Sequence, residues 1–136
     1  MIPDLQTSLI CDDVRQERNG KYILIGIFDG LIVPENHPIG PKICVVNRWC
    51  MGKGSFTQKT RILAPDDTTV AAEGKPIKIE MQNEQQVNTT VEAFINVPFK
   101  VEGTYWIEIL LDQQMRIRYP LHIKPYRPQQ NPAQQA

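Results

Sequence analysis

The sequence predicts an all-β protein, an antiparallel β-sandwich of about eight strands. Three observations favour this fold class. Apolar and polar residues alternate with a period of two in several short runs, which is the pattern of a strand with one buried face. Turn-forming residues separate these runs, and no stretch has the apolar spacing of an amphipathic helix.

The expected strands follow one another along the chain. Asn19-Gly20 is the clearest turn signal between the first two, because both residues tolerate positive φ. A proline-rich loop at 34–41 and hairpin tips at 51–55 and 64–69 separate later runs. The expected strands are residues 5–11, 21–28, 42–51, 55–63, 77–81, 91–97, 105–111 and 117–123.

The last two runs are joined by the short segment "DQQM", which suits a β-hairpin. Pro120 lacks an amide hydrogen and so favours an edge position for the final strand. Tyr105 lies just inside its strand, where its hydroxyl can hydrogen-bond back across the corner, as in immunoglobulin-like domains. The general architecture expected is therefore immunoglobulin-like.

Length and charge limit the possible functions. The chain has 136 residues, which suits one domain, and we expect a sandwich at 1–124 followed by a flexible, proline- and glutamine-rich extension at 125–136. Fifteen basic residues balance fifteen acidic ones, which argues against binding to nucleic acid or to an anionic membrane. The same neutrality leaves self-association unopposed by charge repulsion.

The sequence indicates a cytoplasmic protein. The N-terminus lacks a basic segment followed by an apolar one, and no apolar run is long enough to cross a bilayer. The three cysteines form no CxxC pair and are expected to be free thiols. Cys44 and Cys50 share a strand face roughly 20 Å apart, which excludes joint metal binding or a disulfide.

Cys11 raises the question of a reactive thiol, because "CDD" begins the first connection. A nucleophilic thiol needs a base or another cause of a lowered pKa, whereas Asp12 and Asp13 would raise that pKa. His37 and His122 are the only histidines, and neither is near in sequence. A structural thiol is the favoured interpretation.

Two alternatives use the loops. Aspartates at strand ends could gather around calcium, although no EF-hand spacing is present; the candidates are Asp12, Asp13, Asp29 and Asp112. A small-ligand or carbohydrate-binding module, or a hydrolase, could use Asp12, Asp13, Asp29 and His37. Neither hypothesis assigns a catalytic residue or a cofactor.

Two long stretches carry a family resemblance: "LICDDVRQERNGKYILIGIFDGLIVPENHP" and "VEGTYWIEILLDQQMRIRYPLHI". They resemble a family of small bacterial proteins of unknown function. The shared motifs belong to strands and turns, so the resemblance implies a single-domain β-sandwich and no activity. Gln113 stands where such proteins often have glycine.

We therefore expect a non-enzymatic module that binds an unknown protein partner or a second copy of itself. Open sandwiches expose unpaired strand edges that can accept another strand. The last hairpin, 105–123, is the predicted surface, with Trp106, Arg118 and Tyr119 as anchors.

Overall fold

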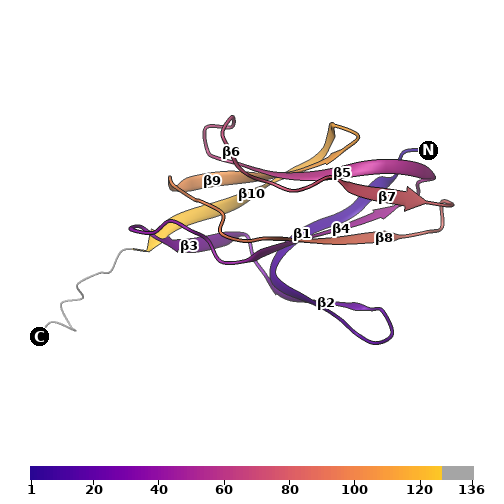
Figure 1. The fold of residues 1–136 in the computed structure, drawn as a ribbon, viewed down its shortest axis with the longest axis horizontal. Coiled ribbons are helices and arrows are strands. Elements are labelled where there is room, and N and C mark those ends of the chain that lie inside the picture. Colours follow the sequence, from indigo (N-terminus) through magenta and orange to yellow (C-terminus); the bar gives the residue numbers. More distant parts are fainter. Residues whose placement is uncertain (127–136) are drawn as a thin grey trace, which may run out of the picture.

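The computed structural model describes residues 1–126, and its regular structure is all strand. No helix in this range is long and apolar enough to span a membrane. Two sheets pack face to face, which confirms the predicted β-sandwich (Figure 1). The strands are β1 (Asp4–Gln16), β2 (Tyr22–Ile27), β3 (Gly30–Pro34), β4 (Ile43–Cys50), β5 (Gly54–Leu63), β6 (Val70–Glu73), β7 (Ile77–Met81), β8 (Asn88–Phe94), β9 (Gly103–Leu111) and β10 (Gln114–Tyr126).

The first sheet has four strands in the order β2-β1-β4-β8. The second has six, in the order β3-β10-β9-β5-β6, and β7 pairs with the other half of β5. All these pairs are antiparallel except β3 with β10, which is parallel. This one parallel pair departs from the expected antiparallel sandwich.

β3 and β6 were not predicted from the sequence, and they raise the number of strands in residues 1–126 to ten. Both are short, and β3 depends on a partner far away in the chain, so a local pattern does not reveal it. The pairing of β3 with β10 also means that only part of β10 lies at the edge of the sheet, whereas Pro120 favours an edge position for the whole strand. His122 to Tyr126 lie beside β3, and β10 is an edge strand only before them.

The predicted end of the domain at Lys124 differs slightly from the structure. β10 continues to Tyr126, because Pro125 and Tyr126 pair with Val33 and Pro34 of β3. The rest of the predicted C-terminal extension lies outside the described residues.

The core lies between the sheets and is built from the inward faces of both. Trp49 and Tyr105 are its largest fully buried side chains, and Ile107 is also fully buried. Full burial of an aliphatic side chain such as Ile107 contributes about 1.5–3 kcal/mol. The Tyr105 hydroxyl donates to the carbonyl oxygen of Val101 at 2.7 Å, which confirms the predicted bond across the corner. Phe99 packs edge-on against the Tyr105 ring, 4.9 Å between centroids.

Strand β1 serves two partners in succession. Residues 4–11 pair with β4, whereas residues 11–16 pair with β2, and Cys11 takes part in both ladders. The hairpin of β1 and β2 therefore extends beyond the body of the sandwich, as Figure 1 shows. Its turn is the predicted one: Gly20 has φ of 89°, and Asn19 Oδ1 accepts the N–H of Lys21 at 3.0 Å.

Candidate functional site

Two of the three predicted anchor residues of the last hairpin are neighbours in space. Trp106 and Arg118 lie together on the outer face of the six-stranded sheet, with the guanidinium carbon 4.3 Å from the Trp106 ring centroid. Arg118 also donates to both carboxylate oxygens of Asp67, at 2.6 and 3.3 Å. Asp67 belongs to the β5–β6 loop and adopts φ of 64°. Both predicted anchors are therefore already engaged within the chain.

A buried carboxylate extends this network. Glu108 is 5% exposed and accepts a hydrogen bond from Arg61 Nη2 at 2.7 Å. Arg118 Nη1 lies 4.0 Å from the second carboxylate oxygen of Glu108. Arg61 of β5 and Glu108 of β9 thus form a charge-assisted pair, so these charged groups on the outer face are already paired within the chain.

Tyr119, the third predicted anchor, lies on the other side of β10 and packs against the core between the sheets. Its hydroxyl is hydrogen-bonded to the hydroxyl of Ser8, 2.9 Å away on β1. Burial raises the pKa of Tyr119 to about 12. It shares no surface with Trp106 and Arg118, because neighbouring residues of a strand point to opposite faces.

The loop aspartates are dispersed. Asp13 forms ion pairs with Lys42 at 3.0 Å and Arg15 at 3.7 Å, and the Lys42 hydrogen bond lowers the pKa of Asp13. Asp112 accepts the N–H of Thr57 at 2.9 Å.

The other loop candidates also lie apart. The Asp12 carboxylate packs against Gly26, where φ of 69° and the close approach leave no room for a Cβ. Asp29 contributes its carbonyl oxygen to the N–H of His122, at 2.8 Å, and His37 is exposed in the β3–β4 loop. Within residues 1–126 no group of three or more His, Cys, Asp or Glu side chains could hold a metal ion. The calcium and loop-site hypotheses stay predictions without a cluster behind them.

The cysteines follow the structural interpretation. Cys11 and Cys44 are cross-strand partners on β1 and β4, and both are buried. Burial is the main cause that raises the pKa of each thiol. This pairing could not be predicted from the sequence, because strand register decides it. Cys50, on the same strand as Cys44, is less buried.

Strand β2 was predicted as a strand, but its exposure was not. It pairs only with β1, so alternate backbone N–H and C=O groups on its other side face away from the sheet. Its apolar side chains remain in contact with water, between 37% and 59% exposed. They are Tyr22, Ile23, Ile25 and Ile27. The uninterrupted apolar run of β2 does not reveal this exposure, because the same run is typical of a strand that is buried on both faces.

A hollow of about 610 Å³ lies between the β1–β2 hairpin and the outer face of the four-stranded sheet. Thr7 and Leu9 of β1 and Val46 of β4 line it from the sheet. Tyr22 and Leu24 of β2 line it from the hairpin. Its volume lies in the range of about 300–1,000 Å³ that is typical of small-molecule sites.

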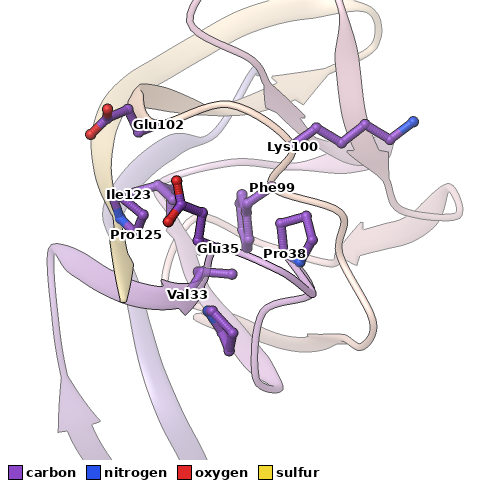
Figure 2. A pocket seen from close by; sticks show the side chains of 9 residues that line it. Val33, Glu35, Pro38, Phe99, Lys100, Glu102, Ile123 and Pro125 are labelled. Carbon is purple, nitrogen blue, oxygen red and sulfur yellow. The ribbon is translucent and has the colours of Figure 1, made fainter. Parts of the chain in front are cut away.

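A second hollow, shown in Figure 2, lies at the end of β10 beside the β3–β4 loop. Val33, Pro38, Phe99 and Ile123 form its apolar part. Its volume is about 120 Å³. That is well below the range of about 300–1,000 Å³ for ligand sites, so it provides no site of useful size.

Comparisons with known proteins place the chain in a family without assigning an activity. No curated protein matches it. Among solved structures, it is similar to an immunoglobulin-like protein from Pseudomonas aeruginosa, with 12% identity and a TM-score of 0.37, over 91% of this chain and 98% of that one. The family model of DUF6941, described as a family of unknown function, matches residues 6–124. The chain therefore belongs to this family of unknown function.

Proposed function

We propose that the protein is a non-enzymatic interaction module that self-associates through the free edge of β2. The observation that carries the proposal is the edge strand itself, uncharged along its length and apolar on its exposed side chains. Such an edge readily accepts a strand from another chain. Three free cysteines support a cytoplasmic location, because a reducing compartment keeps thiols unpaired.

Other outer strands carry protection that β2 lacks. β6 has only four residues, and β3 ends in Pro34. β7 carries Lys78 and Glu80, which form an ion pair at 3.1 Å. Short length, proline and charge are the usual means of preventing edge-to-edge pairing. β8, the other edge of the four-stranded sheet, carries Glu92. β2 contains neither a charged residue nor a proline, which favours pairing at this edge over the edges of β3, β6, β7 and β8.

Charge complementarity favours a second copy as the partner. Lys21 and Asp29 flank the uncharged segment 22–28, and both are exposed. In an antiparallel pairing of two β2 strands centred on Ile25, Lys21 of one copy lies opposite Asp29 of the other. Opposite charges at facing positions stabilise a cross-strand pair. The zero net charge of the chain adds no repulsion between copies.

The predicted hairpin surface at 105–123 supports binding less well. Arg118 is held by Trp106 and Asp67, and a partner would have to replace those contacts. Tyr119 is turned inward. The edge of β2 is therefore a better candidate for the binding surface than the last hairpin.

Light scattering on size-exclusion fractions tests the proposal. The full chain is expected to form a dimer, at twice its mass of 15.6 kDa, over a concentration series. Ile25→Lys places two charges at the centre of the symmetric pairing and is expected to yield a monomer. Ile95→Lys is the matched control, because Ile95 is exposed and lies outside β2; it should leave the mass unchanged.

A wild-type chain that remains monomeric up to about 1 mM would contradict self-association, since an equilibrium weaker than that has no useful affinity. A dimer that survives Ile25→Lys would contradict the assignment to β2. The contribution of the extension is measured on a chain ending at Tyr126, because ending at Lys124 would remove β10 residues that pair with β3.

A further inference from the structure

The hollow beside the β1–β2 hairpin has an apolar interior. Leu24 of β2 packs against the small buried cluster of Cys11, Cys44 and Val46 on the outer face of the sheet. Leu9 lines the same space. An outward sheet face is normally polar in a two-layer sandwich, because it meets water. Here apolar side chains occupy the outer face: Cys11, Cys44 and Val46 are buried, whereas Leu9 and Leu24 remain partly exposed.

The hollow is also positively charged. Lys21 and Arg48 are the charged side chains among its lining residues, which include no Asp or Glu. Arg48 donates from Nε to Gln6 Oε1 at 3.2 Å and from Nη1 to Thr89 Oγ1 at 3.0 Å. Both acceptors are neutral, so they orient the guanidinium without balancing its charge.

We propose that this hollow binds a small carboxylic acid with an apolar body, whose carboxylate meets Arg48. The planar guanidinium matches a carboxylate in geometry and charge. The apolar body replaces water against Leu9 and Leu24, which are partly exposed, and this contributes affinity in proportion to the area covered. Lys21 stands on the hairpin wall and adds a second positive charge at the rim.

The hollow and the proposed β2 pairing share Lys21, which would face Asp29 of a second copy, but the residues that test them differ. Ile25, the centre of the β2 pairing, does not line the hollow, and Arg48 belongs to β4. A monomeric Ile25→Lys variant should therefore retain the ligand site. The two proposals can fail separately. Light scattering of Ile25→Lys tests the β2 pairing, whereas octanoate titration of Arg48→Gln tests the ligand site.

Amide NMR titration of the full ¹⁵N-labelled chain with octanoate tests the site. Saturable shifts are expected at Leu9, Leu24, Val46 and Thr89. Octylammonium, which has the same chain length and the opposite charge, is expected to bind at least about fivefold more weakly, because the charge-assisted hydrogen bond is lost.

Arg48→Gln should weaken octanoate binding at least about fivefold. Arg116→Gln is the matched control on β10, away from the hollow, and should leave it unchanged. If Arg48→Gln perturbs folding, Lys21→Gln provides a milder variant, because Lys21 is exposed. It is compared in the Ile25→Lys chain, where the β2 pairing is already removed, and it too should weaken binding. Equal binding of octanoate and octylammonium, shifts outside the hollow, or affinity unaffected by either variant would overturn the proposal.

Discussion

At the scale of single residues, the buried side chain of Gln58 links the two sheets. Gln58 is fully buried, and its Oε1 accepts hydrogen bonds from Trp49 Nε1 at 2.7 Å and Thr90 Oγ1 at 2.9 Å. These bonds join β5 to β4 and β8, which belong to the opposite sheet. The glutamine therefore stabilises the packing of one sheet on the other by a polar contact inside an apolar core.

Gln58→Leu is expected to destabilise the fold by about 2–4 kcal/mol, because it leaves two buried donors without an acceptor. Urea denaturation followed by tryptophan fluorescence measures this change in the free energy of unfolding. Gln114→Leu is the exposed control and should change stability by less than about 0.5 kcal/mol. Equal effects of the two substitutions would rule out a structural role for the buried amide.

The carboxyl group of Asp66 should make the stability of the fold depend on pH. Its carboxylate accepts hydrogen bonds from Thr69 and Thr68, which lower its pKa from 3.8 to about 2. A lowered pKa in the folded state contributes stability above the unfolded pKa, and this contribution is lost as pH falls through the folded value. The melting temperatures of wild type and Asp66→Ala should therefore differ at about pH 6 and converge from about pH 4 towards pH 2. A difference that is independent of pH would contradict this origin.

At the scale of elements, the β9–β10 turn carries an unfavourable backbone. Asp112 and Gln113 both have positive φ, 47° and 69°, in a connection of two residues. A tight hairpin of this kind favours glycine at its second position. Gln113 stands where similar proteins often have glycine, and here it adopts a positive φ that glycine tolerates better.

Gln113→Gly is expected to stabilise the protein by about 0.5–1 kcal/mol, because glycine adopts positive φ without the steric cost that a Cβ brings. Asp112 is left intact, since its carboxylate accepts the N–H of Thr57. The midpoint of urea unfolding should rise with an unchanged slope. Gln114→Gly, one residue into β10, should instead destabilise, and the reverse order of the two variants would refute the argument.

Much of the element pattern could be predicted from sequence because strands with one buried face alternate. β9 and β10 are the clearest examples. β3 could not be predicted, since its identity as a strand depends on parallel pairing with β10, about ninety residues away. The exposure of β2 could not be predicted either. Its apolar run looks the same in a strand buried on both faces and in an unpartnered hairpin.

For the whole molecule, the two sheets are joined by contacts between residues distant in sequence. Ser8 of β1 and Tyr119 of β10 share a hydrogen bond at 2.9 Å across the interface. We expect Tyr119→Phe to cost about 1 kcal/mol of stability. In a double-mutant cycle with Ser8→Ala, the coupling energy should be about 0.5–1.5 kcal/mol. Additive effects of the two substitutions would show that the bond contributes nothing to joining the sheets.

The sequence by itself determined the fold class, most strands, the turn at Asn19-Gly20 and the corner bond of Tyr105, because each depends on alternation or local backbone preference. Tertiary structure decided which surfaces are available. It turned Tyr119 inward, engaged Arg118 with Asp67, separated the loop aspartates and projected β2 away from the sandwich. The physical reason is that exposure and charge neighbours depend on register and packing between distant segments, which no local pattern encodes.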